Sequence, residues 1–128
     1  MRRLISRIVV GSLMAGGITA LGAAPASAAC QQFILYYHSN QQGACWHTNT
    51  SRPDLANTGP FSCDGDDCRG AGEPVKNNAA SGWNWYDYVT AVVYYNSNYK
   101  GAYDVFRPLD KKNLVNTYNE NASVTLAG

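Results

Sequence analysis

The amino-acid sequence predicts an all-β fold, and three observations point to it. No stretch keeps apolar residues at the three- and four-residue spacing of an amphipathic helix for more than one turn. Short aromatic and β-branched runs alternate with clusters of Asn, Ser, Gly and Pro, a pattern typical of strands joined by turns. The third observation is an internal repeat, because residues 36–44 (YYHSNQQGA) return at 94–102 as YYNSNYKGA.

Residues 1–29 have the features of a secretory signal peptide. A basic start precedes a Gly- and Ala-rich apolar stretch, and Ala26-Ser27-Ala28 offers the small residues that cleavage requires. A retained membrane anchor and lipid attachment at Cys30 are the alternatives, but the apolar run is short and ends in a cleavage pattern. We therefore expect a secreted, extracellular domain at 30–128 that has no stable membrane association once the signal is removed.

The charge balance of this domain argues against one class of partner, and its cysteine count predicts disulfides. Without residues 1–29 the chain keeps seven basic and all nine acidic residues, which argues against a nucleic-acid partner because such proteins present a basic surface. The even number of cysteines in a small exported chain predicts two disulfides, with three possible pairings. They are Cys30, Cys45, Cys63 and Cys68.

The sequence offers no catalytic constellation. Oxidised cysteines cannot act as nucleophiles, and no serine lies in a recognisable catalytic setting. His38 occupies the position that Asn96 takes in the other repeat, which favours a turn residue over a catalytic base. We predict that the protein is not an enzyme and that it uses no metal or other cofactor.

Two runs of residues are the clearest strand candidates. Phe33 to Tyr37 is short and aromatic, and residues 86–95 (YDYVTAVVYY) alternate so that Val89, Ala91, Val93 and Tyr95 share one face. The intervening Trp83-Asn84-Trp85-Tyr86 is predicted to form a buried seam between the two halves of the domain.

The repeat extends beyond nine residues and predicts a hairpin in each half. An aromatic residue is followed after six residues by glycine, and later by Asn-rich residues and Ala-Ser. The glycine would adopt a backbone conformation that a Cβ disfavours, the aromatic ring would cover the bend, and the serine would bond the hairpin backbone. The two sets are Tyr36, Gly43 and Ser81, and Tyr94, Gly101 and Ser123.

This pattern resembles the Greek-key motif of the βγ-crystallins, which reads aromatic, six residues, glycine and then serine. The resemblance implies two four-stranded Greek keys, about 30–85 and 86–128, packed as one β-sandwich. The stretches LYYHSNQQGA, VKNNAAS and NLVNTYNENAS further resemble the small secreted crystallin-fold metalloproteinase inhibitors of actinomycetes. That likeness implies a secreted peptidase inhibitor.

Many βγ-crystallin motifs bind calcium through two acidic or amide residues, two spacers and then Ser/Thr-Ser. Here Lys76 and Tyr118 stand at the leading position, and Ala80 and Ala122 replace the Ser or Thr ligand. Calcium requires six to eight oxygen ligands, so these substitutions remove needed donors. We therefore expect no metal site, although a shifted register from Asn77 would recover part of one.

The two halves differ in length, which locates the candidate functional segment. Gly43 to Ser81 spans 38 positions and Gly101 to Ser123 spans 22, so the first half carries an inserted loop within 51–73. A disulfide between Cys63 and Cys68 would brace this loop. A second disulfide between Cys30 and Cys45 would then crosslink the first hairpin. A surface loop with a purely structural disulfide is the alternative.

A braced loop suits a substrate-like inhibitor, because ordering it in advance lowers the entropy lost on binding. Leu55 or Phe61 could fill an apolar pocket of a peptidase, and Pro60 would stiffen the approach. Ser62 and Arg69 complete the candidate inhibitory residues. We predict that the protein is a monomer that competitively inhibits an extracellular peptidase. The predicted target class is the metallopeptidases.

Two other functions remain compatible with the sequence. One is a toxin-like or antimicrobial effector on the same scaffold, against which the slight excess of acidic residues argues. The other is an extracellular structural or binding module stabilised by calcium, whose melting temperature would rise on calcium addition.

Overall fold

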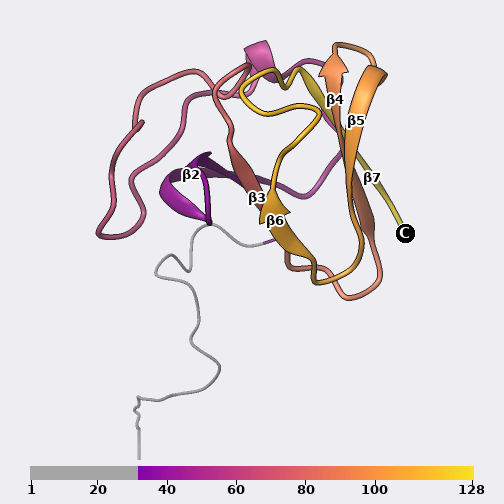
Figure 1. Ribbon diagram of the computed structural model, residues 1–128, viewed down its shortest axis with the longest axis horizontal. Coiled ribbons are helices and arrows are strands. Elements are labelled where there is room, and N and C mark those ends of the chain that lie inside the picture. Colours follow the sequence, from indigo (N-terminus) through magenta and orange to yellow (C-terminus); the bar gives the residue numbers. More distant parts are fainter. Residues whose placement is uncertain (1–31) are drawn as a thin grey trace, which may run out of the picture.

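The computed structural model describes residues 32–128, which form two antiparallel sheets facing each other (Figure 1). The first sheet has the order β2–β1–β3–β6 and consists of β1 (Phe33–His38), β2 (Gln42–Thr48), β3 (Ser81–Asn84) and β6 (Lys111–Asn113). The second has the order β5–β4–β7 and consists of β4 (Thr90–Asn96), β5 (Lys100–Phe106) and β7 (Ser123–Ala127). Within these residues the helical element is one 3₁₀ turn, η2 (Leu55–Asn57). The all-β prediction is confirmed.

The two halves of the repeat form similar hairpins, β1–β2 and β4–β5. In each hairpin the ladder shifts register immediately after the repeated tyrosine, at Tyr36 and at Tyr94. The glycine that follows has a positive φ, +83° at Gly43 and +87° at Gly101, a region that residues with a Cβ rarely adopt. The repeated sequence therefore encodes a repeated backbone bend.

A serine from a later strand closes each bend. The Ser81 hydroxyl donates to the carbonyl of His38 at 2.7 Å and accepts from the Gln41 N–H at 2.9 Å. In the second half the Ser123 hydroxyl donates to the carbonyl of Asn96 at 2.6 Å and accepts from the Tyr99 N–H. Each hydroxyl thus satisfies two main-chain groups that the register shift leaves out of the ladder.

The strands do not divide into two separate four-stranded Greek keys. β6 comes from the second half but pairs with β3 of the first half, with Ser81 opposite Asn113. The corresponding segment of the first half makes one isolated bridge, between Arg52 and Val124 of β7. Pro53 follows directly and has no N–H to continue a ladder, which explains why a full strand does not form there. The exchange joins both halves into one unit.

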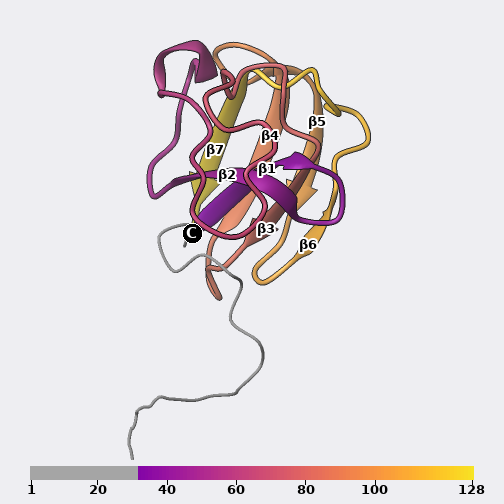
Figure 2. The same cartoon turned by 90° about the vertical axis from the view of Figure 1, so that its left-hand side faces the viewer.

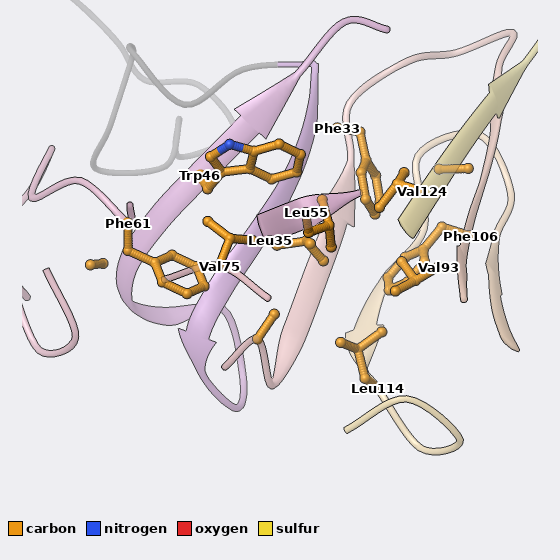
Figure 3. Packing of buried hydrophobic residues seen from close by; sticks show 13 residues of the cluster. Phe33, Leu35, Trp46, Leu55, Phe61, Val75, Val93, Phe106, Leu114 and Val124 are labelled. Atoms are coloured by element: carbon orange, nitrogen blue, oxygen red, sulfur yellow. The ribbon is translucent and has the colours of Figure 1, made fainter. Parts of the chain in front are cut away.

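The main core lies between the two sheets. β1 directs Phe33 and Leu35 into it, and the rings of Phe33 and Phe106 meet edge to face with centroids 5.3 Å apart. Figure 3 shows how side chains from both sheets and from the connecting segments meet there. The largest members are Phe33, Leu35, Trp46, Leu55, Phe61, Val75, Val93, Phe106, Leu114 and Val124.

The tryptophans between the halves lie outside this core, so the predicted seam is wrong. Trp83 pairs with Ile34, on the face of the first sheet opposite to Phe33 and Leu35. The rings of Trp83 and Trp85 are half-buried and 5.4 Å apart, and the ammonium group of Lys111 lies 4.6 Å from the centre of the Trp83 ring. This register leaves both indoles on the outer face.

The predicted strand at 86–95 is also shorter than expected. β4 begins at Thr90, because the buried side-chain amide of Asn84 donates to the carbonyl of Val89 and to those of Phe106 and Arg107. These bonds hold the residues before Thr90 in a connecting loop. Tyr95 is 43% exposed and lies at the register shift between Tyr94 and Asn96, where strict alternation ends.

Burial of Tyr36 predicts a loss of stability at alkaline pH. The ring is 7% exposed, and burial raises the pKa of its hydroxyl to about 12. Because the folded pKa exceeds the usual value near 10, this contribution to stability is complete below pH ~10 and is lost as the pH rises through the folded pKa. Burial also raises the pKa of Tyr86, so absorbance titration should show more than one late-ionising tyrosine, and the step near pH 12 should disappear in Tyr36→Phe. A step near pH 12 that persists in this variant would contradict the assignment.

Candidate functional site

The later part of the insertion within 51–73 docks along the outer edge of β2. Ser62 and Cys45 exchange two backbone hydrogen bonds of 2.9 and 3.0 Å, and the Ala44 N–H donates to the carbonyl of Arg69 at 2.9 Å. Because β2 is the edge strand of the first sheet, these bonds continue the sheet into the insertion. In Figure 1 the part of the insertion that follows η2 projects from the left side of the molecule, and in Figure 2 that side faces the viewer.

The base of the insertion is held in the core by Phe61. This residue is 1% exposed, and its ring meets that of Tyr37 edge to face at 5.7 Å. Its backbone accepts from the Gly72 N–H and donates to the carbonyl of Glu73, at 2.9 and 3.0 Å. The two arms of the insertion, which we define as residues 60–62 and 69–73, are therefore paired with each other as well as with β2.

A disulfide between Cys63 and Cys68 closes a short, largely exposed ring within the insertion. We call residues 63–68 (CDGDDC) the loop tip. Gly65 and Asp66 are exposed, whereas Asp67 is half-buried against the hairpin. A short ring with anchored arms restricts the conformations that the tip can sample.

Asp67 connects the loop tip to the turn of the β1–β2 hairpin. Its carboxylate accepts from the Gly43 N–H at 2.9 Å and from the Arg69 guanidinium at 2.5 and 2.8 Å. The hydrogen bond from the Arg69 side chain, with backbone bonds from Arg69 and Gly43, holds the pKa of Asp67 well below its usual range. The Asp67–Arg69 ion pair is solvent-exposed, so charge attraction alone contributes little to stability. The pair matters because it holds the Asp67 carboxylate in position.

Gly70 allows the second arm to cross the ring of Tyr37. Its φ is +89°, and a Cβ placed on it would lie 2.0 Å from Cγ of Tyr37. The backbone can approach the ring this closely because glycine has no side chain.

The structure also brings together the two Asn-rich segments. Asn121 is buried and donates to the carbonyls of Ala79 and Thr117, while the Ala79 N–H donates to its side-chain oxygen. Two hollows of about 250 and 230 Å³ flank these segments, one lined by Lys76 and Glu120 among others and one by Tyr118. Among residues 32–128 no group of three or more His, Cys, Asp or Glu is placed to hold a metal ion.

A family model matches residues 23–106, which is more than half of the chain; the family is described as peptidase inhibitor family I36. The chain belongs to peptidase inhibitor family I36. Its fold is similar to a structure solved in work on the evolution of the eye-lens βγ-crystallin domain fold. The TM-score is 0.58 at 13% identity, with 84% of this chain and 93% of that chain covered. A search of curated proteins gives no match.

Family membership identifies the protein as a peptidase inhibitor and supports a non-catalytic role. The likeness to the crystallin structure supports the fold alone. Within the part of the chain that the structure describes, no helix is long and apolar enough to cross a membrane.

The candidate inhibitory residues of this I36 inhibitor divide by exposure. Leu55 and Phe61 are each 1% exposed in the core, so the expectation that either fills a peptidase pocket is wrong. Sequence reasoning favoured them as apolar residues in a loop, but the same apolar surface anchors the insertion instead. Pro60, Ser62 and Arg69 are exposed at its surface.

The cysteines are placed as follows. Cys63 and Cys68 form a disulfide, and Cys45 is not a free cysteine. Cys30 lies outside the described residues, so its pairing with Cys45 stays a prediction. Sequence reasoning missed Asp67 and Gly70; the available signals were an acid beside a cysteine and the Gly-Ala-Gly segment at 70–72.

Proposed function

We propose that this I36 inhibitor blocks an extracellular metallopeptidase competitively, with the loop tip in the substrate cleft. The observation that carries the proposal is the arrangement of residues 63–68. An exposed, disulfide-closed segment has both flanks bonded to the edge of β2 through Ser62 and Arg69. A main-chain carbonyl of the tip would be presented to the catalytic metal.

This arrangement favours inhibition over turnover for two physical reasons. The tip is ordered before binding, so less conformational entropy is lost in the complex than for a flexible substrate. If a bond within the tip were cut, the disulfide and the flanking hydrogen bonds would hold the new ends close together. With Leu55 and Phe61 in the core, recognition would fall on the exposed tip and on the neighbouring Pro60 and Arg69.

The decisive experiment compares the mature protein with Cys63→Ser/Cys68→Ser against a thermolysin-like metallopeptidase. We expect one-to-one inhibition by the unmodified protein. The inhibition constant of the double variant should be at least about tenfold weaker, because opening the ring restores entropy worth about 1.4 kcal/mol or more.

Asp87→Asn, an exposed substitution in the connection between β3 and β4, is the control and should inhibit normally. Absence of inhibition at micromolar protein, against metallopeptidases and serine peptidases alike, would refute the proposed mechanism. Inhibition of serine peptidases alone would refute the metallopeptidase assignment.

The proposal includes export, cleavage after residue 28 or 29 and action as a monomer. It also includes a second disulfide between Cys30 and Cys45, and an origin of the two halves as two Greek-key units. Intact mass before and after reduction, together with size-exclusion chromatography, would test cleavage, disulfide number and oligomeric state.

A further inference from the structure

We propose that Asp67 is a positioning residue of the inhibitory loop, because its carboxylate fixes the loop tip on the turn of the β1–β2 hairpin. This inference rests on the proposed function of the tip. It adds that tight binding of the peptidase depends on a contact between the insertion and the repeated hairpin, in addition to the disulfide.

The geometry supports this role because a single carboxylate connects separate parts of the chain. One oxygen, Oδ2, accepts from the Gly43 N–H at 2.9 Å and from Nη2 of Arg69 at 2.5 Å. The other, Oδ1, accepts from the backbone N–H of Arg69 at 3.2 Å and from Nε at 2.8 Å. Asp67 immediately precedes Cys68, so this contact is made directly beside the disulfide.

The partner in the hairpin is a backbone position that allows close approach. A Cβ on Gly43 would lie 3.1 Å from the carbonyl oxygen of Arg69 and 3.0 Å from Cδ2 of His38. The glycine that shapes the hairpin thus also leaves room for the insertion. Gly101 has the same backbone conformation in the second half, where the shorter connection offers no counterpart of the loop tip.

The ionised form of Asp67 makes this contact across the working pH range. Its pKa is lowered in the folded protein, so its contribution is complete above the usual carboxyl range and is lost as the pH falls through the folded pKa. The groups facing it are the Arg69 guanidinium and the backbone of Gly43, with His38 beside that turn and Asp66 adjacent in the tip. Loss of the contact is therefore expected at strongly acidic pH.

The test uses the full mature protein and three variants, Asp67→Ala, Asp67→Asn and Arg69→Ala. Three quantities are measured: the inhibition constant for the metallopeptidase, the exchange rate of the Gly43 amide hydrogen, and the melting temperature. For Asp67→Ala we expect inhibition at least tenfold weaker and Gly43 exchange at least tenfold faster. The melting temperature should change by only a few degrees, because the contact lies at the surface.

The other two variants separate the hairpin contact from the ion pair. Asp67→Asn keeps an oxygen that can accept from the Gly43 N–H, so both effects should be smaller than for alanine. Arg69→Ala removes the guanidinium but leaves the Asp67 carboxylate, so Gly43 should exchange as in the unmodified protein.

The outcomes distinguish this inference from the proposed function. Unchanged Gly43 exchange in Asp67→Ala would overturn the inference, and so would faster exchange with an unchanged inhibition constant. A fall in the melting temperature of Asp67→Ala well beyond a few degrees would show that the weaker inhibition comes from general destabilisation. That outcome would also overturn the inference. If the unmodified protein inhibited nothing, the proposed function would fail and this role with it, while Gly43 exchange would still report whether Asp67 anchors the tip.

Discussion

Replacing Asp104 with alanine should lower the free energy of unfolding by about 3 kcal/mol, the largest effect expected of a polar substitution in this protein. Asp104 is 8% exposed, and its carboxylate accepts hydrogen bonds from one short loop, residues 115–117. It accepts from the N–H groups of Val115, Asn116 and Thr117, and from the Thr117 hydroxyl at 2.6 Å. Alanine would leave these donors without their acceptor in a largely buried site.

Chemical denaturation and calorimetry would measure this effect, with a fall in melting temperature of about 15 °C for a domain of this size. Asp104→Asn keeps one acceptor oxygen and should lose less stability. Asp87→Ala, which removes an exposed carboxylate, is the matched control and should change the stability by less than about 0.5 kcal/mol. Equal effects at positions 104 and 87 would show that the loop does not depend on this carboxylate.

Replacing Gly70 with alanine should detach the second arm of the insertion and weaken inhibition by at least tenfold. The added Cβ would lie 2.0 Å from Cγ of Tyr37, and φ at this position is +89°. The left-handed backbone costs an alanine about 1 kcal/mol, and the steric overlap adds about 1–3 kcal/mol. Either the arm or the ring must move, and the ring is held between Phe61 and His38.

Gly72→Ala is the matched control for this prediction. Gly72 has nearly the same φ, +90°, but a Cβ added there would meet no atom within 4 Å, so this variant carries the backbone strain without the overlap. Inhibition and the rate of cleavage of the insertion by a non-target peptidase should change much more at 70 than at 72. In a Tyr37→Ala background the two substitutions should become similar, because the overlapping ring is absent. Equal effects in the unmodified background would contradict the role of Tyr37.

The sequence predicted the hairpins well because their determinants are local. Gly43 and Gly101 lie in the same short segment as the tyrosines whose bend they shape, so the repeat could be recognised without knowledge of the rest of the fold. The limits of pairing were less predictable. The strand expected from residue 86 starts at Thr90 because the side chain of Asn84 binds the carbonyl of Val89, a contact with no pattern in the sequence.

The candidate site was predictable in location but less so in its parts. Unequal spacing of the two halves identified the insertion, and the close cysteines identified its disulfide. Phe61 looked like an exposed specificity residue because an apolar side chain in a loop can serve either a partner or the core. Its 1% exposure shows that it serves the core.

By itself the sequence determined the strand-rich character of the protein, its repeated bend and the position of the inserted loop, since each depends on residues close together in the chain. The tertiary structure decided which surfaces are available. It paired β6 with β3 across the two halves, directed Phe61 inward and placed Asp67 against the N–H of Gly43. These outcomes depend on contacts between distant residues, whose competition for the same core and the same sheet edge is resolved when the whole chain packs.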